Sequence, residues 1–542
     1  MSNKFAITAG ILIALGAVAG GLFGKLPMSA SADNTVTSGR IVSDYREAVD
    51  VVEKGYVTGI EHEKVTESSI QGMLWTLDPH SSFFTREEFE KLNQEQSSQF
   101  YGIGVSILQH RDGVYVQSVI ANTPADKAGL RYGDRFVQVE GKDATEWTSA
   151  EVSKNVRGEK DTAVKIKVER ATSTTPLDFE IVRGGVPLPS IRNYFMLPNG
   201  TGYVGLTGGF QETTAEELGD AITDLQKQGM KSLVLDLRGN PGGILEQAIS
   251  VVSKFVPSNK TVVSVKGRSS YVTARELRSS SGGEMNFPLV VLINGGSASA
   301  SEIVAGAVQD YGRGVIVGTD SFGKGLVQRV FRMPYGTGLT LTTARYYTPF
   351  GRSLQRDYSS GSIYDYYAHH DEEDPTNADA PKPAGVPITT PDGRTLYGGR
   401  GIEPDVKATP QTFSPVRSRI SEAAFFFVRQ LVSGKVSGFE TFKVEKQNHL
   451  MDIQPGAFQV SDKLLEAFRN FATGAKINGL SAANINSEIE FAKTRVRLEL
   501  ATANNSNEAG IRVLLEVDPQ VLKAVEVMPD AKKMLDTNIA LK

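Results

Sequence analysis

Three serines alternate with alanines where a nucleophile could be presented. Residues 297–301 read Ser-Ala-Ser-Ala-Ser, with two glycines before them and Glu302 after them. The apolar run 288–293 predicts a strand, and the small residues predict the start of a helix. A side chain at such a strand-to-helix elbow lies near backbone N–H groups that can stabilise an oxyanion. A structural interpretation is also open, because Ser299 and Glu302 have the spacing of a capping box.

A lysine between two glycines could supply the base that such a serine needs. Lys324 lies in the sequence Ser-Phe-Gly-Lys-Gly of residues 321–325. Lysine is normally protonated at neutral pH, because its unperturbed pKa is about 10.4, but burial favours the neutral amine. In an extended strand Gln328 would lie on the same face and could orient this amine. The alternative interpretation is an exposed lysine in a turn.

A third segment could complete an oxyanion hole. Residues 235–243 begin as an apolar strand and end in a glycine-rich loop. The N–H groups of Gly243 and Ala300 are the candidates for its two donors. A simple tight turn, in which glycine supplies a positive φ, is the alternative.

Several other chemistries are excluded by the composition. The chain has no cysteine, which rules out disulfides, thiolate metal sites and a cysteine nucleophile. Its six histidines form no His-x-x-x-His pair, so we expect no His-based zinc site. Serine acyl transfer with a lysine base needs neither a metal nor an organic cofactor, so we expect none. Residues 318–324 nearly match a phosphate-binding loop, but position 325 is glycine and lacks the hydroxyl that would bind Mg²⁺. A net charge of −4 gives no basic excess, so we expect no nucleic-acid partner.

The elements that must position these residues follow from the periodicity. Helical spacing predicts a mainly helical region over 40–95, broken at the proline of residues 77–80. Short β-type runs over about 85 residues from position 100 indicate a compact β-rich module. Strands and helices alternate from residue 202, as in βαβ units. Residues 357–397 are polar and proline-rich, which indicates an exposed loop, and residues 416–542 are mostly helical.

Together the catalytic segments resemble the carboxyl-terminal processing peptidases, or tail-specific serine proteases. The resemblance implies that Ser299 is the nucleophile, Lys324 the base and Gln328 its support. It also implies that Gly243 and Ala300 form the oxyanion hole. Asp310 matches an acidic position of the family, but it would lie about 16 Å along the helix from Ser299, so we expect it to be structural. The stretches that carry it are residues 235–243, 296–302 with 305–307, 322–328 and 344–349, with further family-like pieces at 77–84 and 401–405.

The β-rich module resembles a PDZ domain in two ordered segments. Residues 124–130 with Gly133-Asp134 match the PDZ helix and turn. Tyr-Gly-Ile-Gly-Val matches the carboxylate-binding loop, which implies capture of a chain terminus that adds as a strand. Arg157 is a candidate gating residue, with a plain surface arginine as the alternative. The residues of the loop are Tyr101, Gly102, Ile103, Gly104 and Val105.

The resemblance implies an α+β multidomain fold. Its αβ core would be like those of the crotonase and tail-protease folds, with an inserted PDZ domain and helical N- and C-terminal regions. We expect a signal peptide or membrane anchor, because an apolar run over 5–24 precedes a small-x-small site at 30–32. The expected bounds are 1–32 for this segment, 38–97 for the N-terminal helices, 98–184 for the PDZ domain, 185–410 for the core and 411–542 for the C-terminal region.

These expectations combine into one hypothesis of function. The chain would be an envelope-located, periplasmic or otherwise extracytoplasmic serine endopeptidase that cleaves proteins near their free C-termini. Its partners would be protein or peptide substrates, and the membrane if the N-terminal segment stays uncleaved. The sequence leaves an activator or adaptor protein and a homo-oligomer open. Rival hypotheses are a non-catalytic PDZ scaffold and a Ser–Lys hydrolase of small amides or esters.

Overall fold

The computed structural model describes residues 37–96, 99–268, 273–280, 285–358, 366, 385–390 and 392–540. The chain divides into two compact units, Met1–Ser69 and Ile70–Lys542. In the first unit, helix α2 (Ser38–Gly55) is amphipathic and buries none of its residues. Helix α3 (His62–Trp75) runs into the second unit and ends before Pro79, where the sequence predicted a break. No helix within the described ranges is both long and apolar enough to cross a bilayer, and the predicted leader at 1–32 lies outside those ranges.

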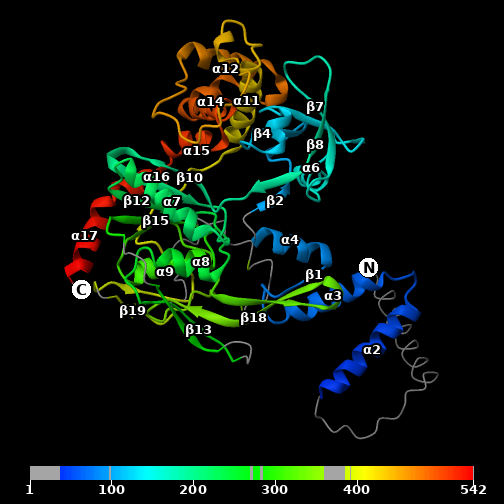
Figure 1. Cartoon of the computed structure of the whole chain (residues 1–542), viewed down its shortest axis with the longest axis vertical. Coiled ribbons are helices and arrows are strands. Elements are labelled where there is room, and N and C mark those ends of the chain that lie inside the picture. Colours follow the sequence, from blue (N-terminus) through cyan, green and yellow to red (C-terminus); the bar gives the residue numbers. More distant parts are fainter. Residues whose placement is uncertain are drawn as a thin grey trace, which may run out of the picture. The chain divides into compact units, whose positions relative to one another are not determined.

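The core of the second unit is a mostly parallel sheet whose strands lead into the loops of residues 237–243 and 294–299 (Figure 1). Strand β10 (Ile191–Met196) is antiparallel to β11 (Thr201–Leu206). The other strands run parallel to β11 in the order β12 (Ser232–Asp236), β15 (Leu289–Ile293), β16 (Val315–Gly318) and β21 (Val406–Lys407). Their apolar residues are buried on both faces, as parallel strands require.

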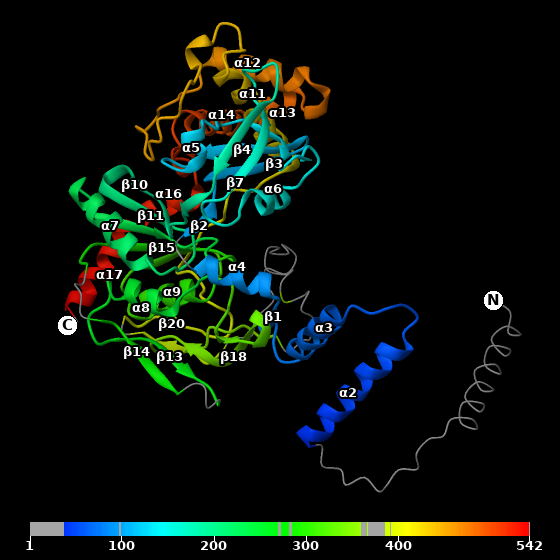
Figure 2. The same ribbon diagram turned by 45° about the vertical axis from the view of Figure 1, so that its right-hand side comes forward.

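Helices cover this sheet on both sides. On one face α7 (Thr214–Lys227), α8 (Leu245–Val252) and α9 (Ala300–Asp310) pack onto Leu233, Leu235 and Val291. On the other face Val234, Val290 and Leu292 pack against α16 (Pro519–Glu526) and α17 (Met528–Ala540), drawn red in Figure 2. The carboxyl ends of β12, β15 and β16 therefore meet at one edge, where ligands bind in sheets of this kind.

A second, antiparallel sheet lies beside the core. Its order is β1 (Ser82–Phe84), β18 (Gly338–Tyr347), β13 (Thr261–Lys266) and β14 (Arg275–Arg278), with β17 (Leu326–Arg332) also paired to β18. Strand β17 begins two residues after Lys324 and carries Gln328. Helix α4 (Arg86–Gln96) follows β1, so residues from before the β-rich module help to build this second sheet.

The PDZ module is a β-sheet of order β3 (Val105–His110), β4 (Gly113–Val119), β5 (Arg135–Val139), β7 (Ala163–Glu169) and β8 (Leu177–Val182), with β6 (Lys142–Asp143) paired to β5. Helices α5 (Pro124–Ala128) and α6 (Ser149–Val156) complete it. Its chain enters and leaves through β2 (Gln99–Gly102) and β9 (Gly184–Pro187), which pair with each other.

The C-terminal region contacts both the PDZ module and the core. Helices α11 (Pro415–Val432), α12 (Asp462–Gly474), α13 (Ala482–Ser487) and α14 (Ile489–Asn504) build a cluster with Tyr115 and Tyr132 of the PDZ module. Phe425 stacks on His110, with ring centroids 4.0 Å apart, and Phe427 packs on Phe468. Helix α15 (Asn507–Leu515) then leads into the two helices on the core sheet. Phe425 and Phe427 are thus interior, and Phe426 between them is partly buried.

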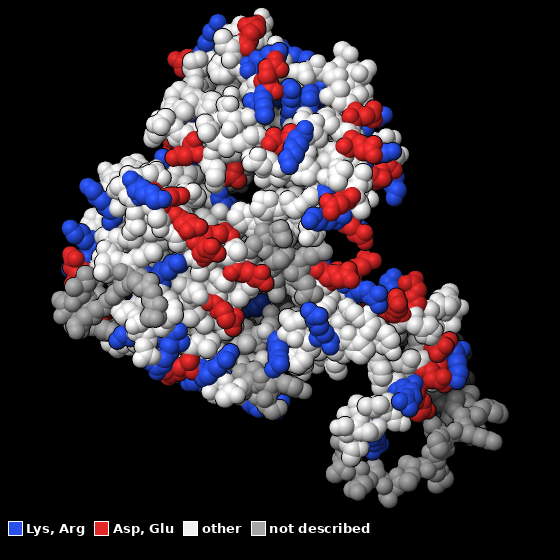
Figure 3. All heavy atoms as spheres, in the orientation of Figure 1, with Lys and Arg blue, Asp and Glu red and all other residues white. Residues whose placement is uncertain are grey.

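The polar stretch that the sequence predicted as a loop falls largely outside the described residues. Within it the structure shows a short hairpin of β19 (Ile388–Thr389) and β20 (Thr395–Leu396). Tyr366 is also described, and it is buried at 7% exposure. Over the face shown in Figure 3, acidic and basic side chains are interspersed.

Candidate active site

The elbow between β15 and α9 holds Ser299 in a strained conformation. Its φ of 55° and ψ of −111° lie in a region that non-glycine residues rarely occupy. Such a backbone costs about 1–3 kcal/mol and persists where surrounding structure enforces it, often at active sites. A Cβ at Gly242 would lie 2.8 Å from the Ser299 Cβ, so only glycine lets the opposite loop come this close.

The three serines of the elbow have different surroundings. The Ser297 hydroxyl donates to the Leu237 carbonyl at 2.8 Å, and the Ser301 hydroxyl donates to the Asn240 carbonyl at 2.9 Å. Both serines are fully buried. Ser299 instead lines an open cleft of about 730 Å³. The outer two serines therefore fasten the elbow to the β12 loop, and only the middle one faces space for a substrate.

The same cleft receives Gly243 from the loop after β12. The φ of Gly243 is 144°, and a Cβ there would lie 2.2 Å from the Phe210 carbonyl oxygen. Phe210 pairs with the residues on either side, because its N–H donates to the Gly242 carbonyl and its carbonyl accepts from Ile244. This pairing leaves the Gly243 N–H outside the ladder. Ala300 is the first residue of α9, where N–H groups have no partner within the helix.

Lys324 and Gln328 form the expected pair. The Lys324 amine donates to the Gln328 side-chain oxygen at 3.1 Å, and both residues line the cleft with Ser299. Burial lowers the pKa of Lys324 below its usual value, although the carboxylates of Glu302 and Asp78 oppose this shift. Strict strand alternation does not explain this pair, because the register of β17 against β18 shifts between Val327 and Gln328.

Glu302 joins the two catalytic segments, a role that the sequence analysis missed. Its buried carboxylate accepts from the N–H groups of Ser299 at 2.9 Å and Lys324 at 2.8 Å. It also accepts from the Gly323 N–H at 2.7 Å and the Ser321 hydroxyl at 2.5 Å. Burial raises the pKa of Glu302, and these four donors oppose the rise. The capping-box spacing pointed to Glu302, but nothing local indicated its bonds 19–22 residues away.

The turn that carries His80 also reaches the site without having been assigned a role from the sequence. The His80 carbonyl accepts from the Gln328 amide, and its imidazole lies 2.9 Å from the Tyr366 hydroxyl. Burial, followed by the charge of Lys324, lowers the pKa of His80 to about 4. His80 is therefore neutral at physiological pH and adds no positive charge beside the lysine.

The candidate peptide-binding loop is shaped by Gly104. Its φ is 88°, and a Cβ there would lie 2.3 Å from the Thr123 Cβ. Ile103 is buried, Tyr101 is 38% exposed, and Val105 begins the edge strand β3. The candidate gating residue Arg157 ends helix α6, with its guanidinium 4.3 Å from the centre of the Phe100 ring. It therefore lies beside the PDZ entry strand β2.

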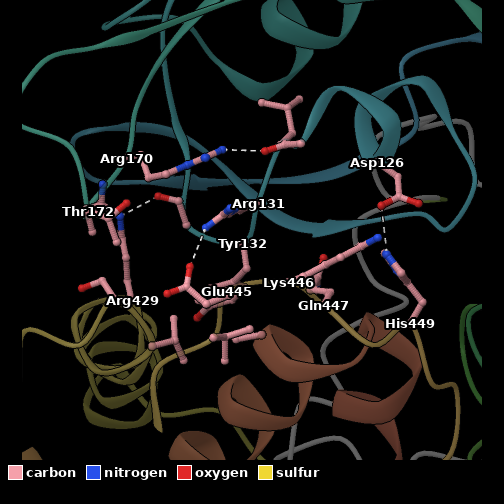
Figure 4. A pocket seen from close by; sticks show the side chains of 18 residues that line it. Asp126, Arg131, Tyr132, Arg170, Thr172, Arg429, Glu445, Lys446, Gln447 and His449 are labelled. Carbon is pink, nitrogen blue, oxygen red and sulfur yellow. Dashed lines mark hydrogen bonds and ion pairs between the residues drawn. The ribbon is translucent and has the colours of Figure 1, made fainter. Parts of the chain in front are cut away.

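A second cavity, of about 280 Å³, lies between the PDZ module and the C-terminal region (Figure 4). It shares no lining residue with the cleft that holds Ser299. Across it His449 contacts Asp126 at 3.1 Å, and Arg429 donates to the Gly133 carbonyl at 2.6 Å. This cavity thus belongs to the interface between the PDZ module and the C-terminal region, and it is separate from the cleft that Ser299 and Lys324 line.

Comparison with known proteins places this geometry in a family. The model of "Peptidase family S41" matches residues 200–366, and that of "PDZ domain" matches residues 102–181. The carboxy-terminal-processing protease of Bartonella bacilliformis is 37% identical over 334 residues, which cover 61% of this chain and 76% of that protein. The chain belongs to peptidase family S41. It is a serine protease of the carboxy-terminal processing type, and the predicted fold class is confirmed.

Two solved structures are similar to parts of this S41 protease. The photosystem II D1 C-terminal processing protease is 27% identical and covers 69% of this chain and 93% of its own, with a TM-score of 0.35. The peptide-bound PDZ domain of a Vibrio cholerae carboxy-terminal protease is 28% identical and covers 17% of this chain and 99% of its own, with a TM-score of 0.16. Residues 70–99 and 411–540 lie outside both family models.

Proposed function

We propose that this S41 protease cleaves proteins near their C-termini with Ser299 as nucleophile and Lys324 as general base. One observation carries the assignment: the hydroxyls of Ser297 and Ser301 are used by the adjacent loop, whereas Ser299 shares a cleft with Lys324. The strained backbone of Ser299 supports it, because such strain concentrates at functional sites.

The reaction would proceed by acyl transfer. The neutral Lys324 amine takes the proton of the Ser299 hydroxyl, whose oxygen attacks the peptide carbonyl carbon. The N–H groups of Gly243 and Ala300 donate to the oxyanion that forms. Lys324 then gives the proton to the leaving amine, and water releases the acyl group. Gln328 accepts from the lysine amine throughout and keeps it aimed at the cleft.

We propose that the PDZ module selects substrates by their C-termini. The terminal carboxylate would bind the backbone N–H groups of residues 101–105, and the peptide would pair with the edge strand β3. Arg157 stacks on Phe100 beside this loop, so we link its position to occupancy of the loop. We accordingly assign residues 98–184 to binding of the substrate terminus and residues 185–410 to cleavage. An envelope location remains part of the proposal and rests on the leader pattern of residues 1–32.

The test is cleavage of an unfolded protein with an apolar C-terminal tail. The full chain, Ser299→Ala and Lys324→Ala are compared on this substrate and on a copy whose terminal carboxyl is amidated. We expect both variants to be inactive and the amidated substrate to be cleaved more slowly. Full activity of Ser299→Ala would refute the proposed nucleophile. Equal cleavage of free and amidated substrates would refute selection by the terminal carboxylate and would leave the proposed nucleophile and base unaffected.

A further inference from the structure

The turn of residues 78–81, which neither family model matches, is built around the buried carboxylate of Asp78. Asp78 is 6% exposed. One of its oxygens accepts from the N–H groups of His80 at 2.8 Å and Ser81 at 2.9 Å, and the other accepts from the Ser81 hydroxyl at 2.8 Å. Such side-chain bonds to the backbone two or three residues on fix the shape of a turn. The Asp78 carboxylate thus determines where the peptide group of His80 points.

The turn is fastened to the sheet that carries the catalytic base. The N–H of Thr342 in β18 donates to the Ser81 hydroxyl at 3.1 Å. Strand β1 begins at the next residue and pairs with β18, with Ser82 opposite Thr340. Strand β17, which carries Gln328, pairs with the same β18. Strand β18 therefore pairs both with the strand that follows the turn and with the strand that carries Gln328.

The His80 carbonyl then fixes which way the Gln328 amide faces. A carbonyl oxygen can only accept a hydrogen bond, so Gln328 must present its NH₂ group to His80. Its oxygen is thereby turned toward the Lys324 amine, to which it lies at 3.1 Å. A neutral amine has one lone pair, and donation of an N–H to Gln328 restricts where that lone pair points.

We propose that Asp78 is a positioning residue for the catalytic base, acting through the His80 carbonyl and Gln328 on Lys324. This inference rests on the proposed function of Lys324. It adds an element from before the PDZ module, outside residues 102–181 and 200–366, to the catalytic apparatus. Asp78 also faces the base electrostatically, because its charge, like that of Glu302, favours the protonated lysine.

Two substitutions of Asp78 separate shape from charge. Asp78→Ala removes both acceptor oxygens and with them three hydrogen bonds, so the His80 carbonyl is released. We expect kcat to fall about 100-fold with KM little changed, the scale of a misplacement of about 1 Å. Asp78→Asn keeps the acceptor for both N–H groups and can donate to the Ser81 hydroxyl instead of accepting from it. We expect its plateau kcat to stay within a few fold of wild type.

The pH profile gives a readout that a merely structural role would not move. The charged groups that face Lys324 are Glu302 and Asp78, and neutral His80 lies behind Gln328. Asp78→Asn removes one negative charge, so the acidic limb of kcat/KM should move to lower pH. Asp310→Asn is the matched control, because its buried carboxylate also accepts three hydrogen bonds, from Phe350 and Arg352. It should lower stability and leave the limb unmoved.

A double-mutant cycle tests whether Asp78 acts through Gln328. If it does, Asp78→Ala combined with Gln328→Ala should be no slower than Gln328→Ala alone, within about twofold. Losses that multiply would overturn the positioning role through Gln328, and an unmoved acidic limb in Asp78→Asn would overturn the electrostatic part of the role of Asp78. If Asp78→Ala does not fold, the limb of Asp78→Asn decides.

The peptidase activity of Lys324→Ala distinguishes failure of the positioning role of Asp78 from failure of the proposed function. Full activity of Lys324→Ala would refute the base and the positioning role together. An inactive Lys324→Ala beside an Asp78→Ala with wild-type rate and profile would refute the positioning role alone.

Discussion

Acidification should loosen the contact between the PDZ module and the C-terminal region through one buried histidine. His110 ends β3, and its imidazole stacks on Phe425. Burial is the main cause that lowers the pKa of His110 from 6.5 to about 4, and Arg111 acts in the same direction. Asp112 opposes the shift, and Glu422 lies 3.8 Å from the ring, but burial outweighs the attraction of these carboxylates.

The sign and size of the effect follow from proton binding. Between pH 6.5 and pH 4 the unfolded chain binds a proton at His110 and the folded chain does not. Stability from neutral His110 is therefore present above pH 6.5 and lost as the pH falls through this window. At pH 5 the loss is about 2 kcal/mol, and below pH 4 it reaches about 3 kcal/mol.

The assay is urea unfolding followed by tryptophan fluorescence at pH 7.5 and pH 5. The chain has only two tryptophans, and Trp147 packs against the PDZ core whereas Trp75 is 56% exposed. Wild type should lose about 2 kcal/mol more than His110→Phe between the two pH values. His62→Gln, at a side chain that is 63% exposed, is the control. An equal loss in wild type and His110→Phe would refute the reasoning.

Three further perturbations test the site and the interface. Ser301→Ala should cost about 1 kcal/mol in urea unfolding, because its hydroxyl bond to the loop is lost, while peptidase activity is kept. Gly243→Ala places a methyl group against Phe210, so the oxyanion donor moves and kcat should fall about 10²–10³-fold with unchanged circular dichroism. Tyr132→Phe removes a 2.8 Å hydrogen bond from the buried Glu499 carboxylate and should destabilise the chain by about 1–3 kcal/mol in urea, with activity loss expected only near the unfolding transition.

Sequence patterns predicted which segments meet at the cleft, because the signals of these segments are local. Small residues after an apolar run indicated the elbow at Ser299, and a glycine-rich loop after the strand ending at Asp236 indicated Gly243. Parallel strands then bring these loops to one edge without further information. The Lys324–Gln328 pair lies within four residues, so spacing alone indicated it, although a register shift invalidates the simple alternation that was assumed.

The missed contributions depend on contacts between distant parts of the chain. Gln328 meets the His80 carbonyl across 248 residues, and Tyr132 meets Glu499 across 367. Periodicity and capping rules concern neighbours, so they cannot identify such partners. Glu302 shows the difference within one residue: its bond to Ser299 follows from capping-box spacing, whereas its bonds to Gly323 and Lys324 require the folded β16 loop.

The C-terminal region is tied to the chemistry as well as to the PDZ module. Arg238 directly precedes the loop that ends in Gly243, and its guanidinium pairs with Asp236 at 2.6 Å and with Asp518 at 2.9 Å. Gln520, in helix α16, accepts from the same guanidinium at 2.8 Å. Helix α14 meanwhile holds the PDZ module through Glu499.

One helical region therefore contacts both the module proposed to bind the substrate terminus and the residue that begins the proposed oxyanion loop. The two contacts are made by consecutive elements of the chain, because α14, α15 and α16 follow one another with only short connections. A chain that lost the residues after 411 would leave His110 without the Phe425 ring that stacks on it, and Arg238 without Asp518 and Gln520. We accordingly regard the C-terminal helices as part of the working protease rather than an appended domain.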